Sequence, residues 1–189
     1  MLPVEYRAKG SAYTGASFSI GNRLRRALWV LVAWFLFAPS PRFCHSWRAF
    51  LLRCFGAKIG VGVHIYPKAR IWAPWNLRCG NHVGIGDGAE IYNPCLIDIS
   101  DWATISQGAF LCGASHDYRS NEFPLIAAPI VIERKAWVAA NAFLHMGVTI
   151  GEGCVIGAAS VVTRSTPPWS VCAGNPCRIV KTYERYKHV

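Results

Sequence analysis

The amino-acid sequence predicts an all-β main domain, a parallel β-helix built from hexapeptide repeats, with a helical segment in front of it. Two observations support this fold class: aliphatic residues recur at six-residue intervals from Ile59 onward, and residues 1–57 have a different, basic and apolar composition. Side chains repeat every 3.6 residues in a helix and every 2 in a strand, so neither gives this period. In a hexapeptide β-helix each hexad supplies a short strand and a turn.

The repeat gives the predicted β-helix domain the bounds 58–189. A small or β-branched residue, such as Val63, follows each aliphatic position by four residues and fits a tight corner, whereas Trp75 departs from this rule. Cys154 is one of these small residues, because a buried thiol acts as a small apolar group. The residues predicted to point inward are Ile59, Ile65, Ile71, Cys79, Ile85, Ile91, Ile99, Ile105, Leu111, Ile132, Val138, Leu144, Ile150, Ile156 and Val162.

Residues 1–57 are predicted to form two short helices. The apolar run ALWVLVAWFLFA, residues 27–38, is shorter than the roughly 20 residues of a membrane-spanning helix. The second helix is expected to have Ser40 as its N-cap and Pro41 at its first position, and to end at Gly56. We expect this helix to oppose an apolar face and a charged face. These are Phe43, Trp47, Phe50, Leu51, Cys54 and Phe55 on one side, and Arg42, Arg48 and Arg53 on the other.

Two interpretations of this N-terminal segment remain open on the sequence alone. Short helices with tryptophans and excess arginine are typical of an interfacial anchor, which binds the membrane surface without crossing it. Alternatively, the same surfaces cap the open end of the β-helix or pack between subunits, an interpretation that leaves the arginines unexplained. The expected location is the cytoplasm, on the inner face of the cytoplasmic membrane if the anchor interpretation holds.

The basic charge does not indicate a nucleic-acid partner. The formal net charge is +10, and much of the excess lies in the first 58 residues, where Glu5 is the one acid. These basic residues alternate with a long apolar run and do not cover a polar face, so we expect no nucleic-acid binding. The eight cysteines include no CxxC pair, and the N-terminus lacks a signal-peptide pattern, which favours a reduced, cytoplasmic chain.

Several stretches resemble hexapeptide-repeat acyltransferases. They are IGVGVHIYPKARI, VGIGDGAEIYN, VTIGEGCVIGAASVVTRSTPPWSVCAGNPCRIVK and the segment containing SHDYRS; GNPCRIVK and SHDYRS are the most specific. The chain is most similar to the colanic-acid-biosynthesis type of sugar O-acetyltransferase, and more distantly to galactoside and maltose acetyltransferases. This resemblance implies a left-handed β-helix, a homotrimer with active sites between subunits, acetyl-CoA as co-substrate, no metal, and a sugar or lipid-linked glycan as acceptor.

The repeat breaks directly after His116, in LCGASHDYRS, and residues 117–131 are predicted to form an arm extruded from the coil. Functional residues commonly lie at such interruptions. A sugar hydroxyl becomes a good nucleophile when a neutral imidazole removes its proton during attack on a thioester carbonyl. The resemblance matches His116 to the family's catalytic histidine, which acts as general base. Asp117 and Asp87 are expected to be turn residues.

The sequence favours direct acetyl transfer over an acyl-enzyme. It has no GxSxG nucleophile elbow, and Cys112 is the one candidate nucleophile near His116. Direct transfer needs a hydrogen-bond donor for the thioester oxyanion, and backbone amides are the usual donors. By resemblance this donor is the amide of Ala140, with Trp137 lining the site and Ala158 lying against the pantetheine arm.

The resemblance also implies binding residues for the two substrates. The phosphates of CoA need cations and hydroxyl groups. The matching residues are Thr163, Arg164, Arg178 and Lys181. Asn93 resembles an acceptor-binding asparagine of the galactoside and maltose enzymes. His145 is a second candidate on the acceptor side, because Met146 replaces a proline common in relatives and changes the shape of this corner.

Two other functions remain as alternatives. Zinc carbonic anhydrases share this architecture and need three histidines from adjoining subunits. His82 and His116 have a suitable separation, but Asn121 occupies the place of the third ligand. A catalytically silent scaffold at the membrane is the other alternative. The favoured function is acetyl-CoA-dependent O-acetylation of a sugar hydroxyl in exopolysaccharide or other surface-glycan biosynthesis.

Overall fold

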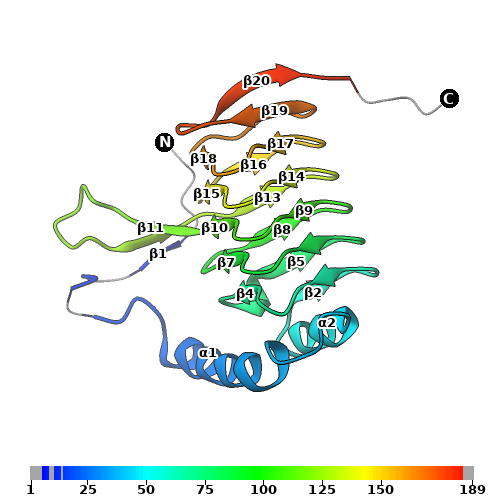
Figure 1. Ribbon diagram of the computed structural model, residues 1–189. Helices are drawn as coiled ribbons and strands as arrows, with labels where there is room; N and C mark the ends of the chain where they lie inside the picture. The colour runs from blue at the N-terminus through cyan, green and yellow to red at the C-terminus, as the bar shows by residue number, and fades with distance from the viewer. Residues whose placement is uncertain (1–5, 9–10, 14, 185–189) are drawn as a thin grey trace.

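The main domain is a prism of three β-sheets around one core (Figure 1). The computed structural model describes residues 6–8, 11–13 and 15–184. The first sheet contains β2 (Lys58–Ile59), β5 (Leu77–Cys79), β8 (Ile97–Ile99), β13 (Ile130–Ile132) and β16 (Thr149–Ile150). The second contains β4 (Arg70–Ile71), β7 (Glu90–Tyr92), β10 (Phe110–Cys112), β15 (Phe143–His145) and β18 (Val161–Val162).

The third sheet runs along the remaining side of the prism. It contains β3 (His64–Ile65), β6 (Gly84–Ile85), β9 (Thr104–Ile105), β14 (Trp137–Val138), β17 (Val155–Ile156), β19 (Ser170–Ala173) and β20 (Arg178–Thr182). All pairs in the three sheets are parallel except β19 and β20, which form an antiparallel hairpin. The chain passes from the first sheet to the third, then to the second, and repeats. This confirms the predicted left-handed parallel β-helix.

The inward side chains stack in register from coil to coil. Ile65 pairs with Ile85, Ile85 with Ile105, and Ile105 with Val138, and all four are fully buried. Parallel strands buried on one face form continuous apolar rows when each coil repeats the same inward position. Trp75, the exception to the repeat, lies in a short 3-10 helix, η2 (Pro74–Asn76).

Two helices close one end of the prism, beside β2 and β4 (Figure 1). The first is α1 (Ile20–Val32), which continues into a π-helical turn, η1 (Ala33–Phe37), and the second is α2 (His45–Cys54). Trp29, Phe37, Leu51 and Leu52 belong to the same buried cluster as the prism core. The indole Nε1 of Trp29 donates to the Ile71 carbonyl at 2.7 Å. The helices therefore cap the core, and we call them the helical cap.

The second helix differs from its prediction in both its start and its buried face. It begins at His45, and Ser40 and Pro41 lie in the preceding turn. Arg48, expected on a charged outer face, is 0% exposed, whereas Phe43 is 81% exposed. The reason is that the Arg48 guanidinium has buried acceptors to bind. Predicting it outward was wrong because the apolar pattern alone does not reveal those acceptors.

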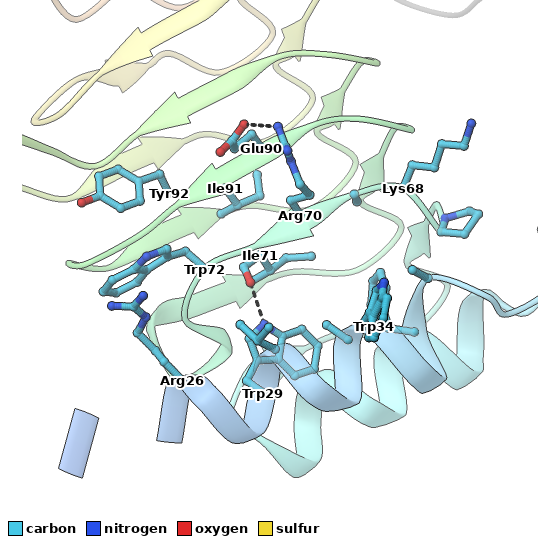
Figure 2. A pocket seen from close by; sticks show the side chains of 16 residues that line it. Arg26, Trp29, Trp34, Lys68, Arg70, Ile71, Trp72, Glu90, Ile91 and Tyr92 are labelled. Atoms are coloured by element: carbon cyan, nitrogen blue, oxygen red, sulfur yellow. Dashed lines mark hydrogen bonds and ion pairs between the residues drawn. The ribbon is translucent and has the colours of Figure 1, made fainter. Parts of the chain in front are cut away.

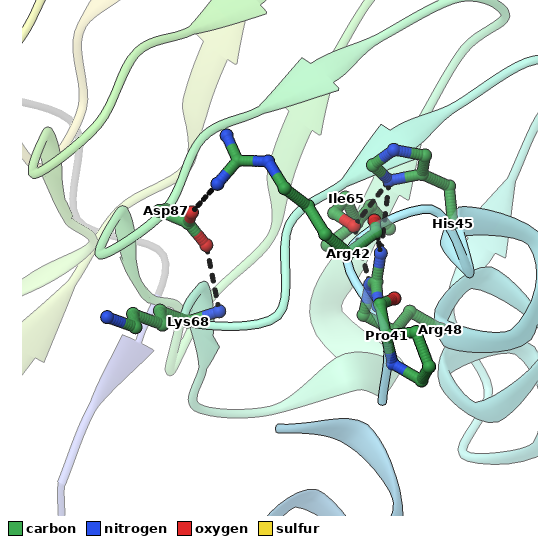
Figure 3. A network of polar contacts seen from close by, with 7 residues as sticks. All are labelled: Pro41, Arg42, His45, Arg48, Ile65, Lys68 and Asp87. Carbon is green, nitrogen blue, oxygen red and sulfur yellow. Dashed lines mark hydrogen bonds and ion pairs between the residues drawn. The ribbon is translucent and has the colours of Figure 1, made fainter. Parts of the chain in front are cut away.

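Arg48 ties the cap to the first coil (Figure 3). Its Nε donates to the Ile65 carbonyl at 2.6 Å and its Nη2 to the Arg42 carbonyl at 2.7 Å. Its Nη1 donates to Ser40 Oγ at 2.7 Å and to the Pro41 carbonyl at 2.9 Å. Burial lowers the pKa of Arg48 from its ordinary value, because desolvation disfavours the charged form. These acceptors compensate the buried charge.

Other arginines of the cap also contact the prism or its margin. Arg53 donates to the Ile59 carbonyl at 3.0 Å, and Arg25 to the Phe55 carbonyl at 2.9 Å. Arg26 lies over the ring of Trp72, 4.1 Å from its centroid. Capping therefore does account for much of the arginine excess, contrary to the expectation from sequence.

Replacing Arg48 should destabilise the protein far more than replacing its exposed neighbour. Arg48→Met leaves buried carbonyls without a donor, and we expect the free energy of unfolding to fall by about 2–4 kcal/mol. Arg42→Gln removes an exposed ion pair with Asp87, 2.9 Å in length, and should cost under about 1 kcal/mol. Denaturant unfolding of both variants measures the difference; equal losses would contradict the anchoring role of Arg48.

Candidate active site

The chain leaves the prism after β10 and forms a β-hairpin (Figure 1). The predicted arm bounds, 117–131, were wrong at both ends, because His116 already belongs to the hairpin and Ile130 has returned to the first sheet. The strands of the hairpin are β11 (Ala114–His116) and β12 (Leu125–Ala127), and the N-terminal strand β1 (Tyr6–Arg7) pairs antiparallel with β12. Ala8, Ala114, Leu125 and Ala127 form a small apolar cluster of their own. The hairpin and β1 thus make a compact support, which we call the arm, and His116 is held at the end of one of its strands.

The hydrogen bond of His116 fixes which ring nitrogen can act as a base. Nδ1 lies 2.9 Å from the carbonyl oxygen of Phe123. A carbonyl only accepts, so in the neutral ring Nδ1 carries the proton and Nε2 keeps its lone pair. The imidazole also stacks on the Phe123 ring, with centroids 4.4 Å apart and planes 2° from parallel. Both contacts orient the ring before a substrate binds.

Phe123 is itself held in a defined conformation. Its backbone φ is 46°, a left-handed value that is uncommon for a bulky residue, and its amide donates to the Ser120 carbonyl at 3.0 Å. The ring of Tyr13 stacks on its other side, with a centroid distance of 5.9 Å. Nothing in the local sequence identifies Phe123 as the partner of His116. Only the closing of the hairpin brings them together.

Asp117 shapes the turn that follows the histidine. Its carboxylate is nearly buried and accepts from the Arg119 amide at 3.2 Å, and its own amide donates to the Pro124 carbonyl at 3.0 Å. A carboxylate that binds local backbone amides stabilises a turn. This arrangement agrees with its expected role as a turn residue.

The amide of Ala140 differs from several of the equivalent amides at another corner of the prism. Between the first and third sheets, side chains of the neighbouring coil cap three of the first turn amides, whereas the Asp101 and Arg134 amides donate no hydrogen bond within the described residues. Asn81 Oδ1 binds Val61 N at 3.0 Å, Asp101 binds Asn81 N at 2.7 Å, and Glu133 binds Glu152 N at 2.8 Å.

Between the third and second sheets, the matching amides of Ala140 and Ala158 donate no hydrogen bond within the part of the chain that the structure describes. Their turns are otherwise ordinary: Asn141 and Ala159, the residues that follow, have φ values of 58° and 55°. These uncapped amides lie one above the other and are available to carbonyl or anionic groups of a ligand.

Trp137 lies on β14, three residues before Ala140, and is 48% exposed. Its indole Nε1 donates to the hydroxyl of Ser106 on the coil below, at 2.8 Å. This bond ties the indole to the neighbouring coil. The structure therefore brings Trp137, Ala140 and Ala158 to one corner, and it adds Ser106, which the sequence analysis did not identify.

The predicted phosphate-binding residues lie at the end of the prism opposite the cap. Arg164 and Arg178 line one shallow cavity of about 380 Å³. Lys181 lies on the same exposed strand as Arg178, in register with Val171. Thr163 is exposed directly after β18. The two arginines are thus brought together, although β19 lies between them in the sequence.

His145 and Cys112 lie side by side at the base of the arm. They are paired residues of β15 and β10, and Tyr92 is the next member of the same row. The Nδ1 atom of His145 lies 3.1 Å from the Met146 carbonyl. Burial raises the pKa of the Cys112 thiol, which keeps it protonated and a weak nucleophile. This observation argues against an acyl-enzyme on Cys112.

Asn93 has a structural role and does not face a substrate. Its side chain is 0% exposed. Oδ1 accepts from the Ala73 amide at 2.9 Å, and Nδ2 donates to the Ala73 carbonyl at 2.8 Å. The Asn93 side chain thus provides the hydrogen-bond partners that a backbone amide and carbonyl of the neighbouring coil would otherwise provide for Ala73, beside η2. The prediction that Asn93 contacts the acceptor was therefore wrong, because the oxygen and the nitrogen of its buried side chain are already bonded to Ala73.

A groove of about 520 Å³ lies between the cap and the second sheet (Figure 2). Trp29, Trp34, Ile71 and Trp72 are among its lining residues, and Arg70 pairs with Glu90 beside it. None of the residues predicted for the site lines it. The groove arises where a helix meets a sheet, a juxtaposition that the hexad pattern does not contain.

No three His, Cys, Asp or Glu side chains are grouped to hold a metal ion within residues 6–8, 11–13 and 15–184. His82 stacks on Trp102, with ring centroids 4.0 Å apart. The zinc alternative therefore has no preformed cluster in the described part of this subunit.

Comparison with known proteins identifies the family. No family model matches the sequence. Over 164 residues the chain is 44% identical to an Escherichia coli K12 protein that bears the name of a colanic acid biosynthesis acetyltransferase, WcaF; the match covers 87% of this chain and 90% of that protein. The chain belongs to the hexapeptide-repeat acetyltransferases.

Solved structures share the fold of this acetyltransferase. A hexapeptide-repeat acetyltransferase of Vibrio cholerae O1 biovar eltor, solved in complex with acetyl-CoA, superposes with a TM-score of 0.81 at 28% identity, covering 94% of this chain and 96% of that one. A galactoside acetyltransferase in complex with coenzyme A has the same TM-score at 24% identity, covering 88% and 84%, and shows the fold alone. These relatives favour acetyl transfer over the carbonic anhydrase and scaffold alternatives.

Proposed function

We propose that this acetyltransferase transfers the acetyl group of acetyl-CoA to a sugar hydroxyl, in the cytoplasm, during the synthesis of an exopolysaccharide or another surface glycan. The observation that carries the proposal is the bond between His116 Nδ1 and the Phe123 carbonyl, which leaves Nε2 as the base. The name of the WcaF relative, which refers to colanic acid, supports a sugar acceptor. Acetyl-CoA in the Vibrio cholerae structure supports the donor.

The proposed reaction is a direct transfer in a ternary complex. The sugar oxygen attacks the thioester carbonyl while Nε2 of His116 takes the hydroxyl proton. The carbonyl oxygen becomes an oxyanion and accepts from the free amide of Ala140. The C–S bond then breaks, and the imidazolium returns its proton to the sulfur of the departing CoA. No electrons are exchanged with another group, and no acyl-enzyme forms.

The corner between the third and second sheets, together with the end of the prism opposite the cap, has the chemistry that CoA needs. The amide of Ala158 and the indole of Trp137 offer the pantetheine arm a polar contact and a flat surface. Arg164, Arg178 and Lys181 supply positive charge for the phosphates, to which guanidinium groups can donate two hydrogen bonds at once. This order along the prism corresponds to the order of the groups in CoA, from thioester to nucleotide.

The two halves of the proposed site lie on opposite edges of the second sheet. Ala140 is at the corner where β14 gives way to β15, whereas the arm with His116 leaves after β10, at the corner toward the first sheet. One prism therefore does not bring its own histidine to its own Ala140. An arm that reaches the Ala140 corner of a second copy would do so, and a head-to-tail contact of this kind closes into a ring. This supports the proposed homotrimer.

The acceptor test uses acetyl-CoA with a panel of undecaprenyl-linked and free sugars. Mass spectrometry should find one added acetyl group on a member of the panel. Incorporation into none of them, together with metal-dependent CO₂ hydration, would overturn the proposed function.

Removing the proposed base should lower turnover while leaving the fold intact. His116→Ala keeps the coil geometry, because the side chain is not inward, and kcat should fall by roughly 10²- to 10⁴-fold. The Kd of acetyl-CoA and the melting temperature should change little. His82→Ala, at an exposed turn, is the control and should keep its activity. If Cys112→Ser or His145→Ala abolishes turnover while His116→Ala does not, another residue is the base.

Removing the amide proton of Ala140 tests the oxyanion donor. Pro168 occupies the equivalent turn position before Trp169, which has a φ of 52°, so the fold accepts proline there. Ala140→Pro should lower kcat by roughly 10²- to 10³-fold, as for loss of one oxyanion donor. Arg134→Pro, at a turn of the same coil on another corner, is the matched control. Equal activity in the two variants would exclude the Ala140 amide.

Mixed assemblies test whether the site is shared between subunits. His116→Ala and Ala140→Pro chains, each inactive alone, are co-refolded in equal amounts. If each site takes the histidine from one subunit and the amide from another, random assembly leaves about a quarter of the sites intact, and activity should recover to that level. Recovery should not occur if each subunit contains a complete site. Steady-state turnover of the mixture decides between the two arrangements.

A further inference from the structure

The outer side of the helical cap carries an apolar surface that the prism does not cover. On α1 and η1, Leu24, Leu31 and Phe35 lie on the helix side opposite the buried Trp29, as the turn of 100° per residue requires. Trp34 is 71% exposed and Phe35 is 63% exposed. We define the outer cap face by its exposed residues: Leu24, Leu28, Leu31, Trp34, Phe35, Leu36, Phe43, Trp47 and Phe50.

The two helices contribute to one continuous surface. The indole Nε1 of Trp47 in α2 donates to the Leu36 carbonyl of η1 at 3.0 Å, and Trp47 stacks on Phe50 with a centroid distance of 5.7 Å. On the other flank, Trp34 also lines the groove between α1 and the second sheet (Figure 2). A contiguous exposed apolar surface of this kind marks an interaction site.

The cap itself contributes only basic residues to the charge around the outer cap face, and the bordering acids of the prism, Asp87 and Glu90, are each paired with an arginine. Residues 20–58 contain no acidic side chain. Arg23, Arg25, Arg53 and Lys58 are exposed in this segment. The hydrogen bonds of Arg25 and Arg53 to the Phe55 and Ile59 carbonyls hold two of these cations where the cap meets the prism. The face is therefore apolar in the middle and cationic at its edge.

An apolar surface with basic residues beside it favours one of two binding partners, a second copy of the chain or an anionic membrane. A second copy of the chain would bring a like-charged rim against this one, with no carboxylate in residues 20–58 to pair with it. Anionic phospholipid provides both a hydrocarbon boundary for the aromatic side chains and negative charge for the rim. In the described residues, neither helix of the cap is long and apolar enough to cross a bilayer. The fit is to a membrane surface.

We propose that the outer cap face docks the protein onto an anionic phospholipid bilayer. Because the cap closes the end of the prism, docking there leaves the arm and the corner between β14 and β15 on the sides of the prism (Figure 1). The inner side of the cap keeps its structural role, so capping and membrane binding use different sides of the same helices. The proposal does not depend on the acetyl-transfer reaction.

Vesicle co-sedimentation of the full-length protein tests the proposal. The probes are phosphatidylcholine vesicles and vesicles in which phosphatidylglycerol replaces part of that lipid. We expect the mole-fraction partition coefficient to be at least about 10-fold larger with phosphatidylglycerol, and to fall as added NaCl shortens the Debye length. No binding to either vesicle, or equal binding to both, would overturn the proposal.

A paired set of variants assigns the binding to the outer cap face. Leu31→Ser/Phe35→Ser removes two exposed side chains from α1 and η1, and should weaken binding by at least about 10-fold. Ile179→Ser/Val180→Ser, with similarly exposed residues on β20 at the opposite end of the prism, is the control and should bind like the unmodified protein.

Two further measurements make the result decisive. Melting temperatures should be unchanged in both variants, because neither pair contributes to the core. A loss of vesicle binding in Leu31→Ser/Phe35→Ser alone then supports docking through the outer cap face. Equal vesicle binding by both variants would overturn the proposal that the outer cap face binds the membrane. Light scattering that finds assemblies beyond the trimer, broken by Leu31→Ser/Phe35→Ser, without vesicle binding, would assign the face to a second copy and overturn the membrane proposal. Acetyl transfer is assayed separately in solution, without vesicles. A failure of the membrane proposal can therefore be distinguished from a failure of the proposed acetyl-transfer function.

Discussion

The structure depends on the in-register stacking of inward side chains from coil to coil. Each coil must place its aliphatic residues directly over those of the coil before, so the chain tolerates extra residues only at corners. The arm shows this limit: it leaves after Leu111 and returns before Ile132, and both residues remain fully buried in the same core. An unbroken core therefore permits an extruded hairpin, and the hairpin supplies the oriented histidine.

The same stacking creates the need for a cap, because a prism ends in an exposed row of apolar residues. Trp29, Leu51 and Leu52 cover that row, and Arg48 fixes the cover through backbone carbonyls on both sides of the junction. Since these contacts lie on the inner side of the helices, the outer side is free of structural constraint. The apolar character of the outer cap face is then not explained by folding, and membrane docking gives it a role.

The division of the proposed site follows from the same geometry. The corner that carries Trp137 and Ala140 and the corner that releases the arm are separated by the full width of the second sheet. A rigid prism cannot bend to bring them together. In the proposed homotrimer a second copy would bring them together without any distortion of the coil, and catalysis would then depend on the oligomer. Asn93, directly after β7, stabilises this frame through its bonds to Ala73.

The sequence by itself determined the period of the coil and the inward residues, because these are local and repeat at a fixed interval. It also indicated an interruption beside His116, although the chain leaves the prism before that residue, after β10. It did not determine the burial of Arg48, the pairing of Asn93 with Ala73, the uncapped amide of Ala140 or the Phe123 carbonyl that fixes the His116 ring. Each of these depends on a polar partner from another coil, from the cap or from across the hairpin. Only the tertiary structure brings such partners within hydrogen-bond distance, so only it decides which polar groups are satisfied and which remain free to act.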